Sequence, residues 1–147
     1  MRRAAAGRIA LLLATLGIAA GARADLELRD GWVAQPPPGA MATAGYGVLA
    51  NTGGEPVELV GFTSPHCDSV ELHRTSYRGD VARMEEVSRL RLPAGDTLRL
   101  APGGTHLMMM RPQPLAAGDT ATIRIELGDG SRREFALPVR RRDGARP

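Results

Sequence analysis

The stretch TATIRIELGDG, residues 120–130, alternates apolar with polar side chains and ends in a glycine-rich turn. Residues two apart in a β-strand point to the same side of a sheet, so the apolar members of this stretch share one face. The closing Gly128-Asp129-Gly130 supplies the positive φ that hairpin turns require. We therefore predict a strand with one buried face and then a tight reversal. The residues expected to face the core are Ala121, Ile123, Ile125 and Leu127.

The rest of the chain repeats this pattern at short intervals. Segments rich in Val, Leu and Ile alternate with Gly and Pro, which is typical of many short strands and not of helices. Pro36-Pro37-Pro38-Gly39 cannot lie within a ladder, Asn51-Thr52-Gly53-Gly54 is expected to supply positive φ in a turn, and Pro93-Ala94-Gly95-Asp96 predicts a β-turn. We expect an all-β sandwich. The nine predicted strands span residues 31–35, 45–51, 57–64, 69–76, 81–88, 97–100, 107–111, 120–127 and 133–139.

The first 24 residues have the three parts of an export signal. Arg2 and Arg3 precede an apolar run over residues 9–20, and Ala22-Arg23-Ala24 forms a small-x-small cleavage site. The run is shorter than the roughly 20 residues of a comfortable membrane span. We expect residues 1–24 to be a cleaved signal peptide, with an uncleaved anchor as the alternative.

We expect the mature chain to form one domain. Residues 25–139 show no internal repeat and no change of composition, and they are enough for a single core. Residues 140–147, which carry four arginines, are predicted to be a basic, disordered tail. Cys67 is the only cysteine, so no disulfide within the chain can contribute to stability.

The net charge of +3 is misleading. Four of the 19 arginines lie within residues 1–24, which leaves 15 arginines against 16 acidic residues in the predicted mature chain. A nucleic-acid-binding domain is expected to be basic, with a clustered patch. The balance of charge therefore argues against a nucleic-acid partner.

Four side chains capable of binding a metal recur at set intervals. His73 is followed after ten residues by Met84, after 21 more by His106 and after one more by Met108. Two imidazoles and two thioethers form a neutral ligand set that suits Cu(I) and not Mg²⁺, Ca²⁺ or Mn²⁺. The sequence therefore predicts a copper site made of His73, Met84, His106 and Met108.

Strand geometry indicates how these residues could meet. His106 and Met108 are two apart in a predicted strand, so both side chains point the same way. Residues 69–88 are expected to form a hairpin, and a two-residue loop at Arg78-Gly79 would place His73 directly opposite Met84. The same register places Glu71 opposite Glu86, a mildly unfavourable pair of like charges. We expect these acidic residues to be solvated, with a supporting role at the site as the alternative.

The chain resembles a known family, the periplasmic, PCuAC-like copper chaperones that supply the copper site of cytochrome c oxidase. The resemblance covers most of the mature chain. Besides the four intervals, it rests on residues 31–39 (GWVAQPPPG), 70–73 (VELH) and 102–110 (PGGTHLMMM). It implies a cupredoxin-like Greek-key sandwich, Cu(I) binding in the periplasm, and transfer to the copper-bearing subunit of the oxidase or a thiol-bearing assembly protein, without catalysis.

Other readings of the sequence remain open. A copper sequestration protein would bind the metal without a recipient, and a sandwich that serves only as an interaction module would not bind it. A blue-copper electron carrier needs a Cys thiolate in the ligand set, and Cys67 precedes all four predicted ligands.

Several further side chains near the site have open roles. Cys67 is either buried, paired between chains or used as a ligand. Met110 shares the parity of His106 and is expected to pack under the site, with ligation as the alternative. His66 is expected to be a surface loop residue, and Met41 and Met109 are expected to fill the core.

Overall fold

The computed structural model describes residues 25–142, and over this range the chain is all β. The predicted signal peptide lies outside the described residues, as does the end of the predicted tail, residues 143–147. The prediction of an all-β fold is confirmed. The described part of the chain has no helix of the length and apolarity that a membrane span requires. The strands are β1 (Leu26–Ala34), β2 (Ala42–Asn51), β3 (Val57–Thr63), β4 (Ser69–Arg78), β5 (Val81–Glu86), β6 (Leu90–Leu92), β7 (Thr97–Leu100), β8 (Thr105–Met110), β9 (Thr120–Leu127) and β10 (Arg132–Arg140).

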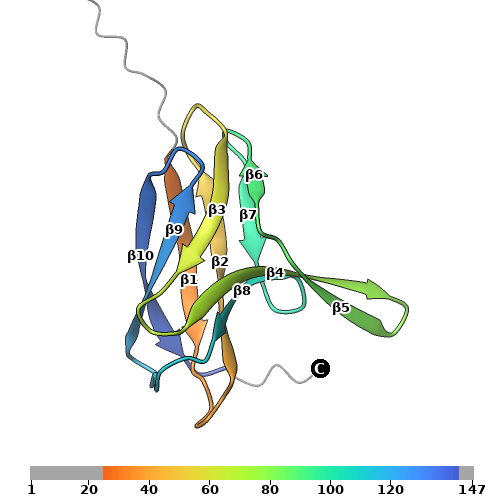
Figure 1. Cartoon of the computed structure of the whole chain (residues 1–147), viewed down its shortest axis with the longest axis vertical. Coiled ribbons are helices and arrows are strands. Elements are labelled where there is room, and N and C mark those ends of the chain that lie inside the picture. Colours follow the sequence, from red (N-terminus) through yellow and green to blue (C-terminus); the bar gives the residue numbers. More distant parts are fainter. Residues whose placement is uncertain (1–24, 143–147) are drawn as a thin grey trace, which may run out of the picture.

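Hydrogen bonding links the strands in the order β5-β4-β8-β2-β1-β10-β9-β3-β6, with β7 paired to β2. A further pairing of β3 with β4, at Phe62 and Val70, closes this path into a sandwich around one core. β1 and β10 run parallel, and the other pairings are antiparallel. The β4–β5 hairpin projects from the body of the sandwich, and every residue of β5 is exposed (Figure 1).

The core collects the inward-facing parity of the strands. All four apolar residues of the opening stretch are buried, which confirms the face predicted for β9. The alternation works because the side-chain period of a strand is two, so a single face can be apolar throughout. The largest side chains that are fully buried include Val33, Leu49, Leu59, Leu72, Leu107, Met109, Ile123 and Ile125.

Most predicted breaks in the chain coincide with turns. The amide of Asp96 donates to the carbonyl of Pro93 over 3.2 Å, and Gly95 has a φ of 78°, which confirms that β-turn. The expected positive φ at residues 51–54 is wrong, since none of these residues adopts it. The predicted strand 45–51 does end where β2 ends, at Asn51, which is buried at 1% exposure.

The C-terminal boundary also differs from the predicted one. Arg140 is the last residue of β10 and pairs with Ala34 of β1. Beyond it, the guanidinium of Arg142 donates to the hydroxyl of Tyr46 and lies 5.8 Å from the centre of the Tyr46 ring. Arg140 and Arg142 of the predicted disordered tail therefore contact the domain, the first through backbone pairing and the second through this cation–π contact.

Candidate metal centre

Three adjacent strands bring the four predicted ligands to one face of the sheet. β4 pairs with β8 so that His73 lies directly opposite His106. β4 also pairs with β5, where Thr75 lies opposite Met84. Because directly opposed residues share a face and Thr75 is two residues from His73, Met84 lies on the same side as the histidines. Met108 is two residues beyond His106 in β8 and shares that face as well.

The predicted hairpin register is wrong by two residues. The loop is Gly79-Asp80 and not Arg78-Gly79, so His73 lies opposite Glu86 instead of Met84. The observed register pairs Arg74 with Glu85 and removes the like-charge pairs of the predicted one. A shift of an even number of residues keeps every side chain on its face, so Met84 stays on the side of the histidines.

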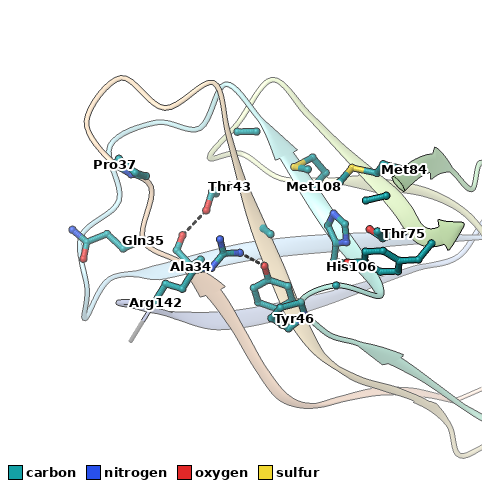
Figure 2. A pocket seen from close by; sticks show the side chains of 16 residues that line it. Ala34, Gln35, Pro37, Thr43, Tyr46, Thr75, Met84, His106, Met108 and Arg142 are labelled. Carbon is teal, nitrogen blue, oxygen red and sulfur yellow. Dashed lines mark hydrogen bonds between the residues drawn. The ribbon is translucent and has the colours of Figure 1, made fainter. Parts of the chain in front are cut away.

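A pocket of about 650 Å³ lies over this face (Figure 2). Three of the predicted ligands line it: Met84, His106 and Met108. Figure 2 shows the side chains of Met84, Met108 and His106 in one part of the pocket, which Tyr46 and Arg142 also line. His73 is not among the lining residues, and its ring centre lies 6.0 Å from that of His106.

The His73 ring has one occupied nitrogen and one vacant one. Nε2 lies 2.8 Å from Oε2 of Glu71, which is two residues earlier in β4. Nδ1 is buried and has no hydrogen-bond partner. Buried polar atoms are nearly always paired, so an orphaned ring nitrogen indicates a missing partner. A metal ion that accepts this lone pair fits the observation.

His106 also has a ring nitrogen with a hydrogen-bond partner, but here the partnered nitrogen is Nδ1 and not Nε2. Its Nδ1 lies 3.1 Å from the carbonyl oxygen of Gly104, and the residue is 6% exposed. A carbonyl oxygen only accepts, so Nδ1 carries the proton and Nε2 keeps a lone pair. A histidine that binds a metal usually donates its other ring N–H to such an acceptor.

Any coordination shell that the two histidines share needs donors other than carboxylates or thiols. Residues 25–142 contain no group of three or more His, Cys, Asp or Glu side chains placed to hold a metal. Two imidazoles alone leave a shell incomplete, and the sulfurs of Met84 and Met108 are soft donors on the same face. Met84 is 50% exposed.

The other methionines and histidine with open roles have different environments. Met110 lies on the same face two residues beyond Met108, opposite Ser69. Met109 is fully buried, as predicted, but the prediction that Met41 fills the core is wrong because it is 67% exposed. His66 lies in the loop between β3 and β4 and does not line the pocket.

Cys67 lies in the same loop, and its thiol donates to the carbonyl of Ser69 over 3.3 Å. Burial raises the pKa of the Cys67 thiol above its usual value of 9.0. Only the thiolate is nucleophilic, so we expect iodoacetamide to alkylate Cys67 several-fold more slowly at pH 8 in the folded protein than in urea. The two rates should converge as the pH rises past the pKa of the folded state. Equal rates at pH 8 would show that burial does not raise the pKa of the Cys67 thiol.

The positions of Glu71 and Arg142 at this face were not predicted from the sequence. Glu71 was expected to be solvated, but it contacts His73, and its i, i+2 spacing in the same strand is the signal that places both on one face. Arg142 was assigned to the disordered tail, and only the tertiary structure brings it to the pocket.

Several solved structures similar to this chain are titled as PCuAC domains. The apo PmoF2 PCuAC domain has a TM-score of 0.67 at 18% identity, covering 84% of this chain and 96% of that one. The solution structure of CuI-DR1885 from Deinococcus radiodurans has a TM-score of 0.66 at 35% identity, covering 86% and 87%. The fold is therefore that of a PCuAC domain, which confirms the predicted cupredoxin-like sandwich.

Sequence comparison agrees with the structural one. A family model described as "Putative lipoprotein LpqE-like" matches residues 26–139. The putative lipoprotein Lxx21020 of Leifsonia xyli subsp. xyli (strain CTCB07) is 38% identical over 128 residues, covering 85% of this chain and 76% of the relative. This chain belongs to the LpqE-like family. The predicted resemblance to PCuAC-like copper chaperones is confirmed.

Proposed function

We propose that this protein binds one Cu(I) ion through His73, Met84, His106 and Met108 and passes it to another metalloprotein in the periplasm. The observation that carries the proposal is that these four side chains, from three adjacent strands, lie on one face of the sheet. The orphaned Nδ1 of His73 beside them supplies a nitrogen with no other partner.

Comparison with relatives supports the choice of metal. The solved relative that is 35% identical is titled as its Cu(I) form, and a second PCuAC domain, from PmoF2, is titled as copper-bound. Neutral imidazole and thioether donors suit Cu(I), and the thioethers in particular disfavour hard ions. The lipoprotein descriptions of the family and of the Leifsonia relative support export of this chain.

The placement of Met84 suggests how the ion is released. Met84 lies on the projecting β5 edge and is half exposed, whereas His106 is buried. A ligand from an acceptor protein therefore reaches the ion first on the side of Met84 and replaces that thioether. Thiolates are stronger ligands for Cu(I) than thioethers, so transfer to a thiol-bearing acceptor is downhill. We propose as acceptor the copper-bearing subunit of cytochrome c oxidase or a thiol-bearing assembly protein.

Mixing experiments test binding and delivery separately. The purified protein should retain one equivalent of Cu(I) after anaerobic gel filtration, and lose it to an excess of the apo copper domain of an oxidase. The copper content of the two separated proteins is the measurement. The same mixing is repeated with an apo thiol-bearing assembly protein. Retention without transfer to either acceptor would favour sequestration, and failure to retain copper would rule out the proposed copper-binding role.

A further inference from the structure

The two histidines of the proposed site hold their protons on different ring nitrogens. His73 Nε2 faces Oε2 of Glu71 at 2.8 Å, and His106 Nδ1 faces the carbonyl oxygen of Gly104 at 3.1 Å. A carboxylate and a carbonyl accept hydrogen bonds and donate none. The proton of a neutral His73 is thus held on Nε2 and that of His106 on Nδ1. The lone pairs left for a metal are on Nδ1 of His73 and Nε2 of His106.

The surroundings of His73 explain why its tautomer matters. Its side chain is 16% exposed, and Nδ1 is buried without a partner. If the proton moved from Nε2 to Nδ1, a buried N–H would be left without an acceptor and the contact with Glu71 would lose its donor. The lone pair would then lie on Nε2, which faces Glu71, and no longer on the unpartnered Nδ1.

We infer that Glu71 is a positioning residue, which holds His73 in the Nε2–H tautomer so that Nδ1 binds Cu(I) while His106 binds through Nε2. The inference rests on the proposed function and names which atoms of the two imidazoles serve it. Glu71 is suited to this role because it lies two residues before His73 on the same face of β4, directly opposite Met108. Outer hydrogen-bond partners of metal-binding histidines commonly change metal affinity by about 10- to 100-fold.

The other carboxylate near His73 offers a matched control. Glu86 lies directly opposite His73 on β5, but the hydrogen bond of His73 goes to Glu71. Glu86 therefore shares the charge and the proximity of Glu71 without its contact. A purely electrostatic effect of a nearby negative charge would make the two residues equivalent.

Long-range ¹H–¹⁵N NMR of the labelled full-length protein at pH 7.5 reads the tautomers directly. In the apo protein we expect His73 to be protonated on Nε2 and His106 on Nδ1. One equivalent of Cu(I) should shift the Nδ1 resonance of His73 and the Nε2 resonance of His106, leaving both protons in place. A larger copper-induced shift at Nε2 than at Nδ1 of His73, or an Nδ1–H tautomer in the apo protein, would overturn the inference.

Three variants separate positioning from folding. Glu71→Gln keeps an oxygen acceptor and should retain the tautomer and nearly all of the Cu(I) affinity. Glu71→Leu removes the acceptor and should mix the tautomers and lower the affinity about 10- to 100-fold. Glu86→Leu should change neither. Circular dichroism reports whether each variant is folded, and a Glu71→Leu protein with unchanged tautomer and affinity would refute the role.

Failure of this inference can be told apart from failure of the proposed function. If the wild-type protein binds no Cu(I), the proposed function fails, whereas the apo tautomers of wild type and Glu71→Leu still decide what Glu71 does to the ring. If Cu(I) binds but the nitrogen assignments differ, only the positioning role of Glu71 is lost.

Discussion

Replacing Met84 and Met108 together by leucine is expected to lower the affinity for Cu(I) by about 100-fold or more, since even outer partners of a metal ligand are worth about 10- to 100-fold. The double variant keeps both histidines but removes both soft donors, and two imidazoles alone leave the shell incomplete. Leucine nearly matches the volume of methionine, and Met84 is exposed while Met108 is only half-buried, so the fold should persist. Anaerobic competition with a chromophoric Cu(I) chelator measures the affinity.

Met109 provides the control for this experiment. It directly follows Met108 in β8 but points to the opposite face, where it is fully buried in the core. Met109→Leu should cost less than about 1.5 kcal/mol of stability and leave Cu(I) affinity unchanged. If the double variant binds as tightly as wild type, thioether ligation at this face is excluded. If Met109→Leu weakens binding equally, the loss reflects packing and not coordination.

The second large effect is expected at Asn51, which ties two loops to the end of β2. Its side-chain amide donates to the carbonyl oxygens of Glu55, Leu92 and Pro93 at 2.8 to 3.1 Å, and its Oδ1 accepts from the amide of Gly53 at 3.1 Å. Asn51 is only 1% exposed, so these hydrogen bonds are shielded from water. We expect Asn51→Asp to lower the free energy of unfolding by about 3 kcal/mol or more, because buried carbonyls lose their donor.

The loss of stability in Asn51→Asp is expected to depend on pH. A carboxylate at residue 51 would face three carbonyl oxygens, so the folded state favours its protonated form and raises its pKa. The deficit should therefore be smallest at acid pH, where the carboxyl group keeps a proton to donate, and grow as the pH rises through the raised pKa. Urea titrations of the variant and wild type at pH 4 and pH 7.5 measure the difference.

Thr52→Ala controls for changes in the same turn. Thr52 is exposed, and its hydroxyl makes only a long contact of 3.5 Å with the carbonyl of Asp25. Its loss should change stability by no more than about 0.5 kcal/mol. A deficit for Asn51→Asp as small as that of Thr52→Ala would show that the loops are held by other contacts.

Strand positions were largely predictable, whereas weak or short elements were not. Nine of the ten strands overlap a predicted one, because alternation bounded by Gly and Pro is a local signal. β6 was missed since it has only three residues, too few to show a period. Its existence depends on pairing with β3, which is remote in sequence.

The register of the β4–β5 hairpin shows the limit of local reasoning. Two registers that differ by two residues place the same side chains on the same face, so the interval between His73 and Met84 does not distinguish them. The choice depends on cross-strand pairs such as Arg74 with Glu85 and on the loop at Gly79-Asp80. Asparagine before glycines is likewise a local turn signal, and it led to the wrong expectation of positive φ at residues 51–54. The burial of the Asn51 side chain depends on loops that are distant in sequence.

The sequence by itself determined the donor types, their intervals and the side of each strand from which they project, because the side-chain period of a strand is a property of a few adjacent residues. The tertiary structure alone decided that β8 returns beside β4, so that His73 meets His106, and that Glu71 and Arg142 lie near them. Strand order across the connection from Leu90 to Thr105 follows from which faces bury together in one core. That is a property of the whole sandwich, and no short stretch of the chain contains it.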